Sequence, residues 1–180
     1  MAEAETQLIL VTGPSRSGKS RWAESLVKGH THVTYVATSA SRPDDKGWEQ
    51  RMQLHRQRRP AHWTLVETDL ALGDAVARIP EDHAVLVDSL GGFVAWGLSL
   101  DTTAWDQHCT HLLKCFGERS TPLVIVIEET GWGVVPATPI GGLFRDRLGA
   151  LAQDLEQFSQ RSWLVVQGRA IDLHALGVRV

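Results

Sequence analysis

The sequence predicts a three-layer α/β fold, in which a mostly parallel β-sheet carries helices on both faces. Three apolar runs, at 84–87, 123–127 and 163–166, are continuous rather than alternating, as is typical of parallel strands covered on both sides. Segments of helical composition at 102–116 and 142–160 lie between them, which indicates βαβ units. Since 180 residues is the length of one domain, we expect the whole chain, 1–180, to form a single domain.

The N-terminal half continues this alternation of strands and helices. A short apolar run predicts a first strand, a glycine-rich loop follows it, and a β-branched and aromatic run predicts a second, buried strand. Proline residues mark where two of the helices end. The expected elements are a strand at 8–12, a helix at 21–27, a strand at 32–38, a helix at 45–59, a short strand at 64–66 and a helix at 71–79.

Composition and charge exclude several classes of protein. The formal net charge of −3, from 18 Lys and Arg against 21 Asp and Glu, weighs against a nucleic-acid-binding protein. No apolar run approaches the roughly 20 residues that a membrane helix needs. The N-terminus, MAEAETQ, has no secretory pattern, so we expect a cytoplasmic protein without stable membrane insertion. Cys109 and Cys115 fit neither a disulfide framework nor a CxxC pair, and we expect them to be incidental residues of a helix.

The strongest motif lies between the first strand and the first helix. It matches the phosphate-binding pattern G-x-x-x-x-G-K-[ST], and its residues are Gly13, Pro14, Ser15, Arg16, Ser17, Gly18, Lys19 and Ser20. The glycines let backbone N–H groups surround phosphate oxygens, and the helix N-terminus adds a favourable dipole. In such loops the lysine contacts the β- and γ-phosphates and the final hydroxyl ligates Mg²⁺. The sequence therefore predicts that the chain binds a nucleoside triphosphate.

A magnesium site in such a protein needs an acid at the end of a nearby strand. Asp88, which closes the run Val85-Leu86-Val87, is the best candidate to join Ser20 in holding the ion. Glu128 and Glu129 follow another strand and are the next candidates. An acid at this place could also merely begin a loop, but ligands of open α/β sheets bind at the carboxyl ends of the strands.

Basic residues gather in one segment of this acidic chain. Between 51 and 62 they are Arg51, His55, Arg56, Arg58, Arg59 and His62, with no acid among them. Such a cluster favours a small anionic ligand, although a solvated helix face has the same pattern. A histidine among arginines could be a nucleophile whose phosphoryl adduct the arginines stabilise, or it could be an ordinary exposed histidine.

Five stretches taken together resemble one family. GPSRSGKS, YVATS, RMQLHRQRRPAHWTLVET, EETGWGVVP and FRDRLGALAQ are similar to the bifunctional adenosylcobinamide kinase / adenosylcobinamide-phosphate guanylyltransferase family, in order from about 8 to 168. The resemblance implies that a nucleoside triphosphate, ATP or GTP with Mg²⁺, phosphorylates the aminopropanol hydroxyl of adenosylcobinamide. GTP then guanylylates a histidine, and the GMP passes to the new phosphate to give adenosylcobinamide-GDP. It also implies a homo-oligomer, in this family a trimer.

The resemblance assigns roles residue by residue. The family's guanylylated histidine lies just before a basic residue and falls on His55. Some relatives carry a second histidine where this chain has Leu54, so His55 is the only candidate in the motif. The predicted nucleotide contacts are Ala37, Thr38, Ser39, Arg56, Gln57, Arg58, Arg59 and Glu67. Asp88 stands where relatives often have Glu, Glu128 replaces a usual Asn or Ser, and Ala152 replaces a frequent Asn. These last two replacements concern the contacts with the corrinoid substrate.

Two other functions use the same loop. A monofunctional P-loop kinase of another small alcohol would leave His55 inert, and a nucleotide-gated switch would bind a protein partner instead of a small acceptor. A histidine surrounded by arginines is needed by neither. Of the seven tryptophans, Trp22, Trp63 and Trp163 are expected in the core, whereas Trp132 could line a corrinoid pocket or pack. The apolar stretch 90–100 could be an oligomer interface or internal core.

Overall fold

The computed structural model describes residues 7–38 and 59–180, and a single β-sheet runs through them. Its strands, in chain order, are β1 (Leu8–Gly13), β2 (Val33–Ala37), β3 (Thr64–Glu67), β4 (Ala84–Asp88), β5 (Leu123–Glu128), β6 (Arg161–Val166) and β7 (Arg169–Asp172). In space they follow the order β3-β2-β4-β5-β1-β6-β7. All neighbouring pairs are parallel except β6 and β7. The carboxyl ends of six strands therefore meet at one edge of the sheet.

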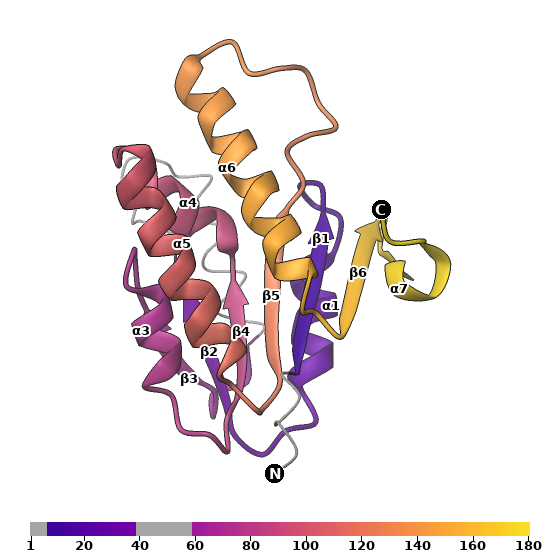
Figure 1. Ribbon diagram of the computed structural model, residues 1–180. Helices are drawn as coiled ribbons and strands as arrows, with labels where there is room; N and C mark the ends of the chain where they lie inside the picture. The colour runs from indigo at the N-terminus through magenta and orange to yellow at the C-terminus, as the bar shows by residue number, and fades with distance from the viewer. Residues whose placement is uncertain (1–6, 39–58) are drawn as a thin grey trace.

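Helices cover both faces of this sheet, as the sequence predicts (Figure 1). They are α1 (Lys19–Val27), α3 (Leu72–Ala77), α4 (Leu90–Gly97), α5 (Thr102–Gly117), α6 (Pro139–Glu156) and the short α7 (Leu173–Leu176). Helices α3 to α6 pack on one face, with Leu72, Phe93, Leu112 and Leu148 in the same buried cluster. Helix α1 packs on the other face through Ala23 and Val27. None of the helices in the described residues is long and apolar enough to cross a membrane.

The central strands are apolar at successive positions because each supplies both cores. In β4, Val85 and Val87 face the cluster under α3 to α6, whereas Leu86 faces the cluster under α1. In β5, Ile125 faces the cluster under α3 to α6, and Val126 faces the cluster under α1. Burial of both faces explains the continuous apolar runs in the sequence.

The predicted strands and helices in the described residues are confirmed, with shifted ends. The helix expected at 142–160 begins earlier, at Pro139, because the Thr138 hydroxyl accepts a hydrogen bond from the Gly141 N–H. Proline at the first helical position is compatible with that start. The helix expected at 45–59 lies, except for Arg59, outside the described residues.

Three elements were not predicted from the sequence: α4, β7 and α7. Helix α4 occupies most of the stretch 90–100, and Leu90, Phe93 and Val94 are buried in the main core. Much of the stretch is therefore internal core, whereas Trp96 is 42% exposed. Trp63 is buried, and Trp22 meets Trp163 edge to face at 5.0 Å beside the second core. The expectation that these tryptophans belong to the core is confirmed for Trp63, whereas Trp22 and Trp163 are partly buried and pack against that core.

Candidate functional site

The phosphate-binding loop joins β1 to α1 at the carboxyl edge of the sheet. Gly18 precedes α1 with φ of 101°, a left-handed conformation that glycine adopts without strain. The Ser17 carbonyl accepts a hydrogen bond of 2.8 Å from the Gly168 N–H, in the turn between β6 and β7. The loop is therefore held on one side by β1 and on the other by the β6–β7 hairpin, which the sequence analysis missed.

Lys19 and Ser20 form the first turn of α1. The Lys19 ammonium donates to the Pro14 carbonyl at 3.4 Å, so the side chain folds back over the loop. The Lys19 N–H donates to the Ser17 hydroxyl at 3.3 Å, and Ser17 is buried. The first turn of α1 contains no acidic residue, so the helix N-terminus retains its attraction for an anion. The loop therefore fits a polyphosphate.

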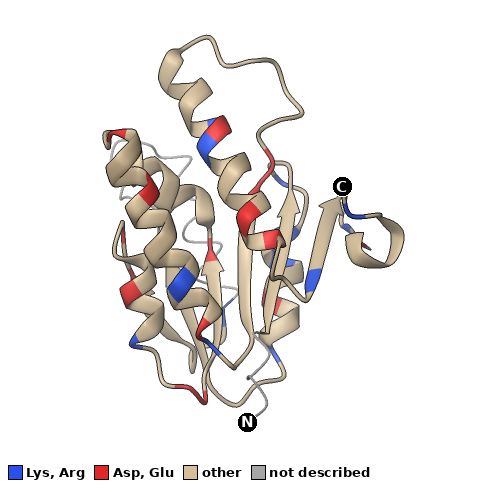
Figure 2. Ribbon diagram, viewed as in Figure 1, with Lys and Arg blue, Asp and Glu red and all other residues tan. Residues whose placement is uncertain are grey.

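Acidic residues mark the ends of two neighbouring strands. Glu128 ends β5, level with Gly13 of β1, and Asp88 ends β4, level with Ala37 of β2. Figure 2 shows these acidic positions where β4 and β5 finish. Since β5 lies between β1 and β4, Glu128 is one strand from the loop and Asp88 is two strands away. Hydroxyl and carboxylate oxygens such as those of Ser20 and Asp88 are ligands that suit Mg²⁺.

A tyrosine orients Asp88. The Tyr35 hydroxyl, on β2, donates to the Asp88 carboxylate at 2.9 Å. Burial, followed by the charge of Asp88 and this hydrogen bond, raises the pKa of Tyr35 well above its usual value, so the phenol stays a donor. The Arg59 guanidinium lies 4.0 Å above the Tyr35 ring. Arg59 is thereby placed near the ends of β2 and β4.

Glu128 is the more enclosed of the two strand-end acids. Its carboxylate accepts hydrogen bonds from the Ser89 hydroxyl and from the Gly91 N–H, the latter at 3.0 Å. A Cβ at Gly91 would overlap this carboxylate, so only glycine permits the close approach. Burial raises the pKa of Glu128, the hydrogen bond from Ser89 opposes the shift, and the Lys19 charge opposes it further. The carboxyl group therefore lies within the electrostatic reach of the loop.

Glu129, the other acid after β5, has a local role. Its carboxylate accepts from the Gly131 and Trp132 N–H groups, at 2.5 and 3.1 Å, and so closes the turn that follows the strand. Because the Glu129 carboxylate already accepts hydrogen bonds within its own loop, Asp88 is the better candidate for a metal ligand. Trp132 is 63% exposed, so of its two alternatives, burial by packing against the described residues is not observed.

The other predicted nucleotide contacts fall in different surroundings. Thr38 is fully buried; its hydroxyl donates to the Ser89 carbonyl, and its own carbonyl accepts from the Trp96 indole at 2.9 Å. Glu67 is exposed at the end of β3, level with Ala37. The contacts of Thr38 and Glu67 with nucleotide stay predictions. Ser39, His55, Arg56, Gln57 and Arg58 lie outside the described residues.

Three residues of this edge escaped the sequence analysis: Tyr35, Ser89 and Gly91. Each acts through an acid on another strand, and such contacts depend on the strand order. A signal was nevertheless present, because Tyr35 opens the YVATS stretch and Ser89 and Gly91 lie one and three residues after Asp88.

Solved structures with low sequence identity share this architecture. A prototypical ATPase from the type III secretion system of pathogenic bacteria aligns with 97% of this chain and 59% of its own, with a TM-score of 0.62 and 12% identity. A protein of Pyrococcus horikoshii OT3 aligns with 93% of this chain and 86% of its own, with a TM-score of 0.54 and 10% identity. At these identities the likeness concerns the fold alone.

The fold and the loop between β1 and α1 define a class, the P-loop nucleotide-binding proteins of α/β architecture. Within that class, the family model described as cobinamide kinase / cobinamide phosphate guanyltransferase matches residues 9–173. The chain therefore belongs to this family. The resemblance carried by the five sequence stretches is confirmed, and the family match disfavours both the kinase of an unrelated alcohol and the switch protein.

Three relatives agree with the family model, each over nearly its full length. The bifunctional adenosylcobalamin biosynthesis protein CobU of Escherichia coli (strain K12) is 33% identical over 181 residues, which is 92% of this chain and 99% of that protein. CobU of Salmonella typhimurium is 34% identical over the same shares of the two chains. The corresponding CobP of Pseudomonas aeruginosa is 35% identical, over 91% of this chain and 95% of that protein.

Proposed function

We propose that this chain phosphorylates adenosylcobinamide with a nucleoside triphosphate and then converts the product to adenosylcobinamide-GDP with GTP, as a step of cobalamin biosynthesis. The observation that carries the proposal is the convergence of the loop with Lys19 and Ser20 and the strand-end acids Asp88 and Glu128 on one edge of the sheet. Membership of the family supplies the substrate class, a corrinoid. One domain, 1–180, would serve both reactions.

The phosphorylation step needs positioning and charge compensation. The substrate hydroxyl oxygen forms a bond to the γ-phosphorus, the bond from that phosphorus to the bridging oxygen breaks, and the hydroxyl proton leaves to a base or water. Lys19 and the N–H groups of the first turn of α1 offset the negative charge on the phosphate oxygens. Mg²⁺ held by Ser20 and Asp88 would neutralise charge on the β- and γ-phosphates. Tyr35 supports this role because it fixes the Asp88 carboxylate.

The guanylyl transfer uses a protein nucleophile. The neutral His55 imidazole attacks the α-phosphorus of GTP, the bond to the pyrophosphate oxygen breaks, and pyrophosphate leaves. A phosphate oxygen of the phosphorylated substrate then takes the GMP, which regenerates the histidine. The support is the sequence motif, in which Arg56, Gln57, Arg58 and Arg59 follow His55 and can bind phosphate oxygens.

ATP and GTP are the proposed nucleotides, with Mg²⁺ as the ion, and the cytoplasm is the proposed compartment. We also infer a homo-oligomer, a trimer in line with the resemblance. Exposed apolar side chains in the loop after β5 support association: Trp132 is 63%, Val134 96% and Val135 68% exposed. The Asp74, His111 and Cys115 side chains take no part in this scheme.

The experiment that tests the function follows two products in sequence. Purified protein is incubated with adenosylcobinamide, ATP and Mg²⁺, and then with GTP. The corrinoids are separated by reversed-phase chromatography and identified by mass spectrometry. We expect adenosylcobinamide phosphate first and adenosylcobinamide-GDP after GTP is added. Phosphorylation without the second product would leave a monofunctional kinase, and the absence of both products would refute the proposal.

A further inference from the structure

Three metal-binding side chains meet where α3 packs against α5, among residues that the proposed reactions do not use. They are Asp74 of α3 and His111 and Cys115 of α5. One carboxylate oxygen, one ring nitrogen and the sulfur all lie within 4.8 Å of one another. The His111 Nε2 atom is 2.8 Å from the Asp74 Oδ1 atom and 3.7 Å from the Cys115 Sγ atom.

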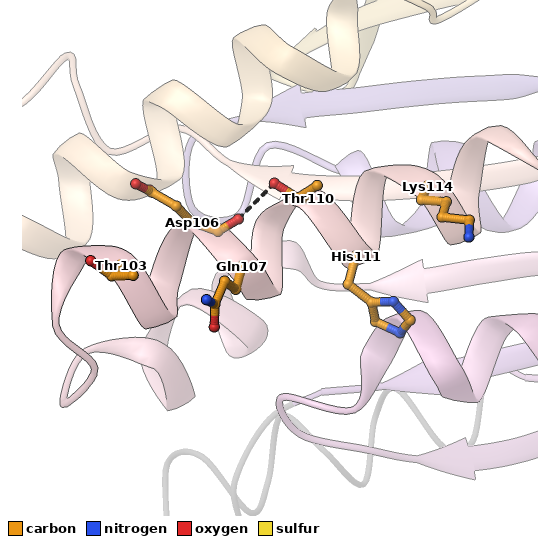
Figure 3. Close-up of a pocket in the computed structure, with 6 residues that line it drawn as sticks. All are labelled: Thr103, Asp106, Gln107, Thr110, His111 and Lys114. Atoms are coloured by element: carbon orange, nitrogen blue, oxygen red, sulfur yellow. Dashed lines mark hydrogen bonds between the residues drawn. The ribbon is translucent and has the colours of Figure 1, made fainter.

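The local sequence explains how the three side chains come together. His111 and Cys115 are four residues apart on α5, so they share one face of that helix. Gly73 lets α3 approach this face, since a Cβ there would lie 3.3 Å from His111 Cδ2 and 3.4 Å from Cys115 Sγ. Asp74 follows directly and brings its carboxylate alongside. Figure 3 shows the His111 ring projecting from α5 toward α3.

We propose that Asp74, His111 and Cys115 bind a Zn²⁺ ion. Sulfur, imidazole nitrogen and carboxylate oxygen are the donors that zinc takes in proteins. Zinc bond lengths of about 2.0–2.3 Å in a tetrahedron separate neighbouring donors by about 3.3–3.6 Å. The observed 2.8 Å lies about half an ångström below that range and the observed 3.7 Å about a tenth of an ångström above it, and the third pair of donors, from Asp74 and Cys115, lies within 4.8 Å. Small rotations of the side chains would bring the three donors to these separations. Three protein donors leave a fourth position for water.

An ion pair alone accounts for only part of the cluster. A half-exposed His111–Asp74 pair explains two of the side chains, whose exposed fractions are 52% and 48%. It does not account for the third donor, Cys115, a residue with 8% exposure whose Sγ atom lies 3.7 Å from the His111 Nε2 atom. Burial, with the Asp74 and Glu118 carboxylates, raises the pKa of Cys115, and a divalent cation would reverse that effect by binding the thiolate.

Solvent reaches the cluster from one side. A shallow groove of about 530 Å³ runs along α5 and is lined by Thr103, Asp106, Gln107, Thr110, His111 and Lys114 (Figure 3). Lys114 extends toward Glu118, 3.8 Å away, rather than toward Asp74. The groove therefore gives an ion and its water a path to the open side of His111. A bound ion would join α3 to α5 and stabilise the folded chain, because an ion that binds only the folded state raises its stability.

Cobalt(II) in place of zinc gives a direct test on the full chain. The protein is freed of metal with a chelator and titrated with Co²⁺, and absorption from thiolate-to-cobalt charge transfer is recorded. We expect one equivalent of Co²⁺ to give this band, Zn²⁺ to abolish it by displacement, and Zn²⁺ to raise the Tm. Cys115→Ser should lose the band, whereas Cys109→Ser, a change on the same helix, should keep it.

Two partly exposed positions keep the test independent of folding defects in the Cys115 variant. Asp74→Asn and His111→Ala should each weaken Zn²⁺ binding at least tenfold, with far-ultraviolet circular dichroism unchanged. Asp106→Asn, which alters an acid in the same groove but outside the cluster, should leave Zn²⁺ affinity within twofold. No cobalt–thiolate band in the wild type, or a band that survives Cys115→Ser, would overturn the proposal.

Discussion

Arg147 provides a sharp test of how the family-specific FRDRLG stretch supports the fold. Its side chain is buried on α6 and donates to the Gly97 carbonyl at 2.7 Å and to the Leu100 carbonyl at 2.9 Å. The guanidinium also lies 4.8 Å from the centre of the Trp105 ring. Arg147 therefore caps the end of α4, the helix that begins just after Asp88 and Ser89.

Replacement by leucine keeps the apolar stem and removes these polar contacts. A hydrogen bond from a charged donor contributes about 1.5–3 kcal/mol, and the change leaves two buried carbonyls without this donor. Release of a buried charge offsets part of the loss. We expect Arg147→Leu to lower the free energy of unfolding by about 3 kcal/mol. For a chain of this size that corresponds to a fall in Tm of roughly 6–12 °C.

Arg145→Leu is the matched control from the same stretch. Among the described residues, Arg145 forms side-chain hydrogen bonds to the neighbouring Asp146 alone, at 2.8 and 3.0 Å, and the Asp146 side chain is 67% exposed. Such a surface pair contributes about 0.2–1 kcal/mol. Urea unfolding followed by circular dichroism measures both variants, and an unchanged m-value would show that stability alone has changed. If Arg147→Leu loses no more stability than Arg145→Leu, the capping role is refuted.

Three further predictions concern the loop, the thiols and assembly. Lys19→Ala should reduce phosphorylation by orders of magnitude, because the transferring phosphates lose their fixed positive charge; near-normal turnover would remove the loop from the mechanism. Burial, and then Asp106, raises the pKa of Cys109 to about 12, so at pH 8 about one thiol in ten thousand is ionised. Alkylation of Cys109 by iodoacetamide should accordingly be slow at pH 8 and accelerate about tenfold per pH unit up to pH 10; rapid labelling at pH 8 would contradict this. In sedimentation at micromolar concentration the protein should be an oligomer, and a species of 19.9 kDa, the monomer mass, would count against association.

The alternation of strands and helices was predictable because it depends on local pattern. Continuous apolar runs identified the central strands, and their burial on both faces is what the structure shows. Helix α4 escaped because Gly91, Gly92 and Gly97 lower helix propensity, and because its apolar residues are not confined to one face. Strand β7 is a short antiparallel edge strand after a turn at Gln167 and Gly168, both with positive φ, and Gly168 was the one signal for that hairpin.

In the candidate site too, residues of a local motif could be predicted from the sequence, whereas contacts between distant segments could not. The phosphate-binding loop is a contiguous motif, so its eight residues could be read directly from the sequence. The hydrogen bond from Tyr35 to Asp88 joins strands that are far apart in the chain, and it could not be foreseen without the order of the strands. The same holds for Cys115, which looks incidental on its helix until α3 brings Asp74 beside it.

A labelling experiment with GTP determines whether His55 carries GMP between GTP and the corrinoid phosphate. Protein treated with GTP and Mg²⁺ is denatured, and its peptides are examined by mass spectrometry for a GMP adduct that is labile to acid and stable to base. We predict the adduct on His55 in the wild type, its removal by pyrophosphate, and its absence from His55→Asn, which should still phosphorylate adenosylcobinamide. Undiminished labelling of His55→Asn, or a wild-type protein that takes up no GMP, would show that His55 is not the carrier of GMP.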